Sequence, residues 1–205
     1  MEKSKTKYEI LHDQRRKQIM DTTKKLVLSS NISSVTMSDI ASACNISRQT
    51  LYKYFSSFDE VIYAIQSEII QNFPVIPETD FYHFMDALAD LLFHFSREHA
   101  EDFLFISMFD IYARTHKTEQ DLHRYYRTII RDRISHLRKT TEHMPQTING
   151  YPAEEVFSVA AHAIWGFVTR LAVLGDSYYD TSHVSEEKSL EILKDMVASY
   201  LNRQG

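Results

Sequence analysis

Six polar side chains that can bond nucleic acid are concentrated in one eight-residue segment of this 205-residue chain. They are Arg48, Gln49, Thr50, Tyr52, Lys53 and Tyr54. Leu51 and Phe55 lie four residues apart, so a helix would turn both inward and leave the polar set facing outward. Guanidinium and amide groups bond base edges, whereas amines and hydroxyls bond phosphates. A short helix that presents this set fits the major groove of DNA.

The residues before this segment predict a second short helix and a tight turn. Thr36 followed by Asp39 is typical of a capping box at a helix N-terminus. Asn45 falls where that helix must end, and asparagine tolerates the left-handed conformation found there. Ser47 is a second N-cap residue, directly before the polar helix. The pattern therefore predicts two helices joined by a turn, although a plain helical hairpin with polar surface residues would share it.

The same residues resemble the helix-turn-helix of TetR-type transcriptional repressors. The resemblance extends from about Arg16 to Val61, and it is carried by Ile40-Ala41, Ile46-Ser47, Thr50-Leu51-Tyr52 and Phe55. It implies DNA-binding positions, which we expect at Thr36, Ser47, Arg48, Gln49, Thr50, Tyr52, Lys53 and Tyr54. Thr36, Tyr52, Lys53 and Tyr54 would position the protein on phosphates, and Arg48, Gln49 and Thr50 would read bases.

Three positions depart from the family pattern. Asn45 replaces the usual turn glycine, and Tyr54 replaces a histidine. Phe58 stands where a lysine usually opens the next helix, which removes a phosphate contact that the resemblance would otherwise imply.

Charge and cysteine content agree with a DNA-binding head on a larger body. Residues 1–60 carry ten Lys and Arg against seven Asp and Glu, whereas residues 61–205 carry thirteen against twenty-one. The basic excess thus lies where a polyanion would need it. Lys3, Lys5 and Lys7 are either a solubilising tail or a minor-groove arm. One cysteine, no apolar N-terminal signal and no apolar run near bilayer length predict a cytoplasmic protein without a membrane segment.

Helical periodicity and four glycines predict an all-α fold without a convincing strand. We expect an N-terminal three-helix helix-turn-helix DNA-binding domain over residues 1–57. A C-terminal helical bundle for regulation and dimerisation is expected over residues 58–205. Asp80 to about His99 and Phe103 to Tyr112 predict body helices, and the second of these is apolar nearly all round, as in a buried helix. Pro145, Asn149, Gly150 and Pro152 indicate a polar loop.

Two long helices near the C-terminus, at Ala153 to Leu174 and Ser185 to Asn202, are apolar over more surface than one core needs. The first has a broad apolar face at Val156, Val159, Ala160, Ala163, Ile164, Phe167, Val168 and Leu171. Such a surplus indicates a partner surface, unless all of it faces the protein's own core. The family resemblance implies a homodimer joined through a four-helix bundle of these helices.

A small-molecule site is expected in the body, because the resemblance implies a pocket among helices that carry many aromatic side chains here. The candidate lining residues are Phe105, Phe109, Asp110, Tyr112, Tyr126, His162 and Trp165. Asp110 and His162 stand out as polar residues within apolar helices. If its carboxylate is unpaired, Asp110 could bind a cationic or hydroxylated ligand. The alternative is that Asp110 pairs with Arg114 or Arg127 and that His162 is a hydrogen-bonded core residue.

Catalytic motifs are not found. The chain has no metalloprotease, dithiol, phosphate-loop or nucleophile-elbow motif, and its ten histidines lack ligand spacing, so we expect no enzyme, metal or cofactor. The expected function is a transcriptional regulator of double-stranded DNA, a repressor released from a palindromic operator by an apolar or aromatic effector. Two alternatives remain: a DNA-binding protein whose body binds a protein partner, and a helical ligand carrier or enzyme that does not bind DNA.

Overall fold

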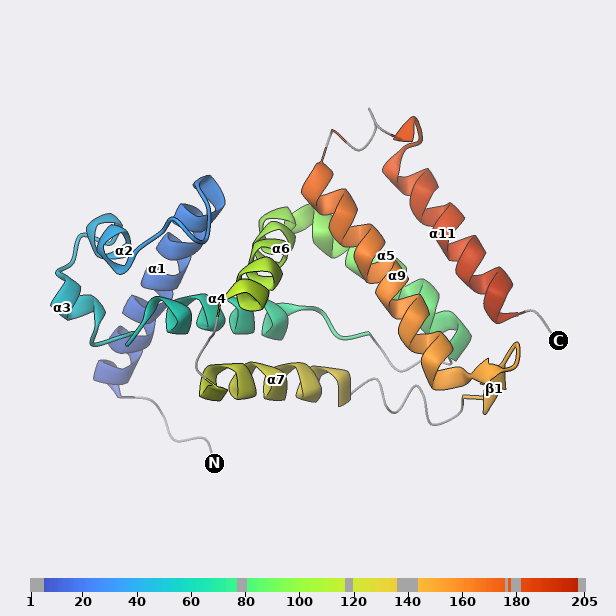
Figure 1. Ribbon diagram of the computed structural model, residues 1–205, viewed down its shortest axis with the longest axis horizontal. Coiled ribbons are helices and arrows are strands. Elements are labelled where there is room, and N and C mark those ends of the chain that lie inside the picture. The colour runs from blue at the N-terminus through green and yellow to red at the C-terminus, as the bar shows by residue number, and fades with distance from the viewer. Residues whose placement is uncertain are drawn as a thin grey trace. The chain divides into compact units, whose positions relative to one another are not determined.

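The computed structural model describes residues 6–76, 81–116, 120–135, 144–175, 177 and 182–202. The protein is 77% helical, which confirms the all-α class (Figure 1). In chain order the elements are α1 (Lys7–Ser29), α2 (Met37–Ala43), α3 (Arg48–Leu51), α4 (Phe58–Asn72), α5 (Phe81–Glu98), α6 (Ala100–Thr115), α7 (Gln120–Ser135), β1 (Thr147–Ile148), β2 (Tyr151–Pro152), α9 (Ala153–Leu174) and α11 (Glu186–Leu201).

The chain divides into two compact units, and each is made of two separate stretches of sequence. The first combines Met1–Gln71 with Phe105–Ile129, and the second combines Asn72–Leu104 with Ile130–Gly205. The first unit thus contains the helix-turn-helix, nearly all of α4, most of α6 and the first part of α7. The proposed boundary between residues 57 and 58 remains a prediction.

The helix α1 begins at a side-chain cap. Thr6 forms a capping box with Glu9, so the helix starts at Lys7. Lys7 therefore belongs to the helix, and Lys3 and Lys5 lie outside the described residues. One face of α1 supplies the core of the helix-turn-helix with Ile19, Met20 and Val27.

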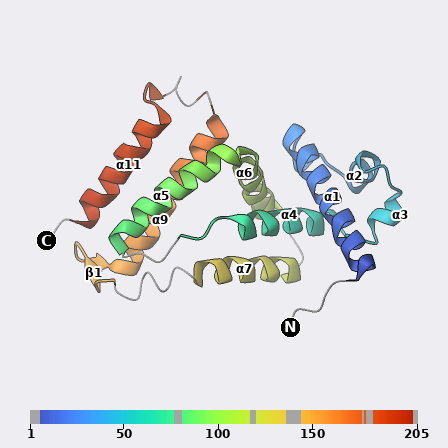
Figure 2. The ribbon, with the colours of Figure 1, turned by 180° about the vertical axis from the view of Figure 1, so that it is seen from behind.

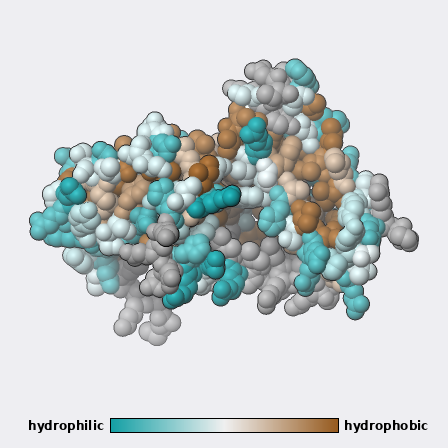
Figure 3. All heavy atoms as spheres, viewed as in Figure 1, coloured by the Kyte–Doolittle hydropathy of each residue, from teal (hydrophilic) through white to brown (hydrophobic). Residues whose placement is uncertain are grey.

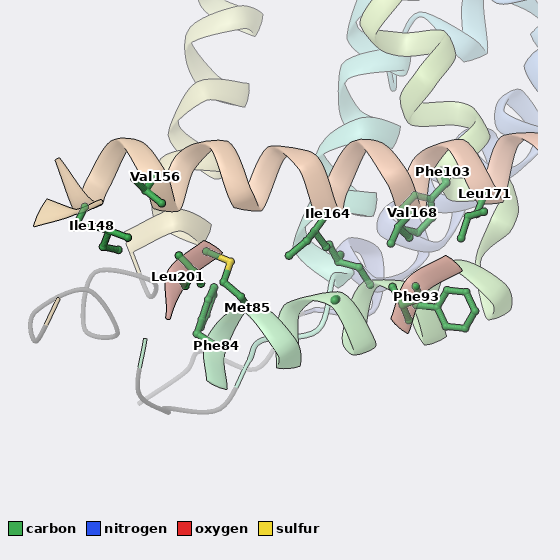
Figure 4. Packing of buried hydrophobic residues seen from close by; sticks show 14 residues of the cluster. Phe84, Met85, Phe93, Phe103, Ile148, Val156, Ile164, Val168, Leu171 and Leu201 are labelled. Atoms are coloured by element: carbon green, nitrogen blue, oxygen red, sulfur yellow. The ribbon is translucent and has the colours of Figure 1, made fainter. Parts of the chain in front are cut away.

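The core of the second unit lies where α5 and α9 pack along each other (Figure 2). Figure 4 shows Ile164 and Val168 of α9 pointing toward α5. Both are fully buried, as are Phe84 and Met85 of α5. The helix α11 adds Leu190 and Leu201 to this core.

A β-hairpin precedes α9, which corrects the expectation of a polar loop without strands. Ile148 pairs with Tyr151 and Thr147 with Pro152 in antiparallel register. Asn149 and Gly150 both have positive φ, of 51° and 81°, as an Asn-Gly type I′ turn requires. Asn149 also donates a 2.7 Å hydrogen bond from Nδ2 to the carbonyl of Tyr200, which ties the hairpin to the end of α11.

The apolar face predicted on α9 is divided between two environments. Val156, Ile164, Val168 and Leu171 are buried in the core, whereas Val159 is 70% exposed. Figure 3 shows apolar side chains gathered at the surface over α9 and α11. The described chain thus covers most of the predicted face and leaves Val159 and Ala163 exposed.

Among the described helices, α9 alone is long and apolar enough, by length and composition, to cross a membrane. Its buried side belongs to the core of the second unit, which accounts for part of that apolar character.

Candidate nucleic-acid interface

The short helix α3 begins at a side-chain cap. The Ser47 hydroxyl accepts a 3.0 Å hydrogen bond from the backbone N–H of Thr50 and lies 2.9 Å from the Thr50 hydroxyl. Regular α-helix ends at Leu51, but the chain continues to turn, because the N–H groups of Tyr54 and Phe55 both donate to the Leu51 carbonyl. The predicted helix over residues 48–55 is therefore one regular turn followed by a tighter one.

The turn between α2 and α3 is closed by backbone hydrogen bonds around Asn45. Asn45 has a φ of 52°, as the sequence indicated. Its N–H donates to the Ser42 carbonyl, and the N–H of Ile46 donates to the Ala41 carbonyl. This pair of bonds is a Schellman motif, in which a left-handed residue satisfies the last carbonyls of a helix. Asparagine thus performs the role of the usual glycine.

The polar side chains of α3 lie as the spacing predicted. Leu51 and Phe55 are 0% and 1% exposed, whereas Arg48, Gln49, Tyr52 and Lys53 are exposed. Thr50 and Tyr54 are half-buried. The first turn of α3 and the residues after it thus present a guanidinium, an amide, a phenol and an amine to solvent together.

Thr36 serves first as a cap. Its hydroxyl accepts from the N–H of Asp39 and donates to the Asp39 carboxylate at 2.6 Å. This side-chain hydrogen bond, with a second from the Thr36 backbone, lowers the pKa of Asp39 below its ordinary value. A DNA phosphate at Thr36 would have to replace that carboxylate as the acceptor of the hydroxyl proton. The Asp39 carboxylate therefore competes with the predicted phosphate contact.

The sequence did not single out Arg16, yet it holds α3 in place. Its guanidinium lies 4.0 Å from the centre of the Phe55 ring, and Nη1 donates to the Tyr54 carbonyl at 3.3 Å. Nη2 is 4.0 Å from a Glu60 carboxylate oxygen at the start of α4. Arg16 therefore joins α1, the end of the α3 segment and α4. The signal that could have identified it is a basic residue on the first helix together with the aromatic pair Tyr54-Phe55 after α3.

The predicted effector residues fall in both units. Phe105, Phe109 and Tyr112 of α6 are buried in the first unit, and Tyr126 of α7 is half-buried there. Trp165 of α9 belongs to the second unit, where its ring centre lies 5.5 Å from that of Phe103 and 5.7 Å from that of Phe73. The seven residues thus do not form a single site within one unit.

Asp110 and His162 are less buried than expected. Both are exposed. Asp110 forms no ion pair with any described residue, so the alternative pairing with Arg114 or Arg127 is not observed. Its carboxyl group is still partly surrounded by protein, and this burial raises its pKa. His162 Nδ1 lies 2.6 Å from the Ser158 carbonyl one turn earlier. An exposed helix face, rather than the core, therefore accommodates each polar side chain.

Gln66 is a polar residue on the buried, mostly apolar side of α4, and the sequence analysis did not identify it. It is 0% exposed, and its Nε2 donates to the Tyr126 hydroxyl at 3.1 Å. Its Oε1 has no hydrogen-bond partner among the residues that the structure describes. Burial of an unpaired amide oxygen costs about 1–3 kcal/mol, so such a group is rarely retained without a role.

No metal-binding group of three His, Cys, Asp or Glu side chains occurs within the described parts of the chain. The capped turn, the exposed polar helix and the supporting α1 instead define a helix-turn-helix head in an all-α protein, a class that reads DNA.

Residues 19–65 match the family model described as "Bacterial regulatory proteins, tetR family", in agreement with the sequence resemblance over this segment. No curated protein sequence matches the chain.

Solved structures of TetR-type regulators share the fold over nearly the whole chain. FadR, the fatty acid degradation regulator of Bacillus halodurans, gives a TM-score of 0.65 at 14% identity, covering 98% of this chain and 100% of that chain. GusR of Salmonella enterica gives 0.62 at 18% identity, covering 92% and 96%. AibR, solved with isovaleryl coenzyme A and operator DNA, gives 0.61 at 15% identity, covering 93% and 100%. At these identities the likeness concerns the fold.

Proposed function

We propose that this protein is a homodimeric repressor that binds a palindromic operator and is released by a small-molecule effector. The observation that carries the DNA-binding part is the exposed set Arg48, Gln49, Tyr52 and Lys53 on a helix that is capped and packed from behind. Arginine and glutamine discriminate bases through paired hydrogen bonds in the major groove. A two-fold dimer would place two such helices about 34–36 Å apart, in successive major grooves.

The exposed apolar side of α9 and α11 supports dimerisation. A groove of about 520 Å³ runs between the two helices, with Val159 and Ala163 on one side and Met196 and Tyr200 on the other. Val159 is 70% exposed and Met196 64%. Contiguous apolar surface of this kind marks an interaction site, and a second copy of the same helix pair would bury it.

Effector control is supported by the composition of the first unit. Aromatic and polar side chains of α4, α6 and α7 meet in the same unit as the helix-turn-helix. AibR, which shares this fold, was solved with isovaleryl coenzyme A and operator DNA, and this supports effector control as part of the proposal. A ligand that binds two head arrangements with different affinity would shift the population between them.

The test is selection of DNA fragments by the purified protein, followed by affinity measurements on the selected sequence. A palindromic consensus is expected. Arg48→Ala and Gln49→Ala should each weaken operator binding by about 1–3 kcal/mol and relax base preference at one position of each half-site. Gln18→Ala, an exposed glutamine on α1, is the matched control.

Two results would contradict the proposal. The first is selection of no consensus sequence. The second is a consensus whose base preferences are unchanged in both α3 variants.

A further inference from the structure

The ring of His12 on α1 stacks on the ring of Tyr54, which follows α3. The two ring centres are 4.8 Å apart, and the ring planes are inclined by 28°. Figure 1 shows the N-terminal end of α1 beside the segment that follows α3. One turn further along α1, Arg16 donates a hydrogen bond to the Tyr54 carbonyl. Two side chains of α1 therefore hold Tyr54, one at its ring and the other at its main chain.

Both stacked rings have a polar atom available for a ligand. The His12 Nδ1 lies 3.8 Å from an Asp13 carboxylate oxygen, whereas its Nε2 has no hydrogen-bond partner among the described residues. The Tyr54 hydroxyl likewise has no partner in the part of the chain that the structure describes. The His12 side chain is 38% exposed. An imidazole nitrogen and a phenol are thus available together, next to the exposed Lys53.

The ionisable groups around His12 come from two segments of the first unit. They are Tyr8, Glu9, Asp13, Arg15 and Arg16 of α1, and Lys53 and Tyr54 after α3. Among the described residues, only Asp13 places a carboxylate within 4.0 Å of the His12 ring nitrogens. The nitrogen on the other side of the ring, Nε2, therefore remains open to an anion from outside the protein.

The start of α4 cannot supply a cation to the DNA backbone near Tyr54. Its first three residues are Phe58, Asp59 and Glu60, an apolar residue and two acids. The Phe58 ring packs edge-on against Tyr112. A positive charge on this side of the helix-turn-helix must therefore come from another helix, and α1 brings His12 to the required place.

We infer that His12 is a further contact to the DNA backbone, in which its ring positions Tyr54 and its protonated form binds a phosphate through Nε2. Histidine takes up its proton between about pH 5 and pH 8. A hydrogen bond from an imidazolium to a phosphate is charge-assisted and therefore stronger than a neutral one. DNA binding would then be linked to proton uptake, and the affinity would rise as the pH falls. This inference rests on the proposed function, because it assigns another residue to the same DNA-binding head.

The test measures DNA affinity of the full-length protein by fluorescence anisotropy at pH 6.5 and pH 8, at one ionic strength. The probes are the selected operator and a random duplex of the same length, because a phosphate contact acts on both. The parent protein should bind each duplex about 3- to 10-fold more tightly per protomer at pH 6.5. Its salt slope should also be steeper at pH 6.5, by up to about one unit per protomer.

Three substitutions at His12 separate its charge from its packing. His12→Phe keeps the stack on Tyr54 without a charge, so it should retain the affinity at pH 8 and lose most of the pH dependence. His12→Arg is planar and always charged, so at pH 8 it should bind at least as tightly as the parent protein does at pH 6.5. His12→Ala loses both properties and should bind more weakly than the parent at either pH. A purely structural role for His12 would not make the arginine variant bind more tightly.

The matched control is another stacked histidine of the first unit. The His116 ring lies 4.1 Å from that of Tyr112, centre to centre, at the end of α6. His116→Phe should therefore leave both the affinity and its pH dependence unchanged. Tyr54→Phe keeps the stack but removes the hydroxyl, so it should lower the affinity at both pH values and preserve the pH dependence.

Three results would overturn the inference: a parent affinity that does not change with pH, a pH dependence that persists in His12→Phe, or weaker binding by His12→Arg than by His12→Phe at pH 8. If any of these occurs while the protein selects an operator, the role of His12 fails alone. If the His12-dependent effect appears on the random duplex and no consensus sequence is selected, the operator-specific function fails alone.

Discussion

The Arg16 guanidinium lies over the ring of Phe55, with 4.0 Å between its central carbon and the ring centre. The two residues are on opposite sides of the helix-turn-helix sequence, one on α1 and the other just after α3. Their contact fixes the end of the reading segment against the helix that precedes it. A guanidinium suits this position because it can stack on a ring while its N–H groups bond elsewhere.

Arg16→Ala should therefore lower operator affinity indirectly, by loosening α3. We expect a loss of about 1 kcal/mol or more in the free energy of unfolding, from the stacking and hydrogen bond together. Arg16→Lys keeps the charge but cannot stack on the Phe55 ring, so it should restore little of the lost stability or operator affinity. Full recovery of operator affinity with lysine would instead identify Arg16 as a direct phosphate contact.

Lys53 is exposed and has no ion-pair partner among the described residues, which suits a phosphate contact. Lys53→Ala should weaken binding to operator and to random DNA alike, and should reduce the salt slope by about one unit. Fluorescence anisotropy over a salt series measures both. Lys188→Ala, the same charge change on α11, serves as the control. A loss limited to the operator with an unchanged slope would contradict the assignment.

The dimer surface can be tested at residues that the monomer does not need. Phe167 and Val197 pack partly against the core, so a charge at either position would also destabilise the protein. Val159→Glu and Met196→Glu should give folded monomers in sedimentation experiments, because a charge buried between two copies lacks a partner. Ile111→Glu, at a site 67% exposed in the first unit, should leave the dimer intact. Dimers that persist in both variants would place the interface elsewhere.

Tyr112 joins α6 to the start of α4 by donating a hydrogen bond from its hydroxyl to the Asp59 carboxylate. Its ring also lies edge-on to Phe58, at 6.0 Å between centres, so the phenylalanine that replaces the family's lysine has a packing partner. Burial and then the bond to Asp59 raise the pKa of Tyr112. Tyr112→Phe should cost about 1.5–3 kcal/mol in the free energy of unfolding, measured by urea denaturation at neutral pH. A neutral effect would show that Asp59 finds an equivalent partner.

Lys194 gives the second unit a defined pH dependence. Its Nζ is 2.8 Å from both Asp90 oxygens. Burial lowers the pKa of Lys194, but the hydrogen bond and charge of Asp90, with Asp86, outweigh burial and raise the pKa above 10.5. A raised lysine pKa means that the stabilisation is complete below about pH 10 and is lost as pH rises through the folded-state value.

The corresponding variant is Lys194→Met. At neutral pH it should unfold about 2–4 °C below the parent protein, as expected for roughly 1 kcal/mol. The difference should shrink at alkaline pH. A difference that stays constant to the most alkaline pH at which the protein folds would assign the loss to packing instead.

The helix-turn-helix was predictable residue by residue because local interactions decide it. Thr36 and Ser47 cap helices through bonds to residues three positions away, and Asn45 ends a helix by its own conformation. The spacing of Leu51 and Phe55 determines which side of the short helix faces inward. Each of these effects acts within one or two turns, so no knowledge of distant neighbours was needed.

The body was decided by tertiary structure, since periodicity shows which residues share a face but not what covers that face. On α9, Ile164 and Val168 are buried in the core of the second unit, whereas Val159 is exposed. Gln66 is buried among apolar residues of α4, and only the approach of Tyr126, sixty positions later, gives its amide nitrogen a partner. Sequence therefore determined the helices and the DNA-reading head, whereas packing between distant segments determined the burial, exposure and polar pairing of the body.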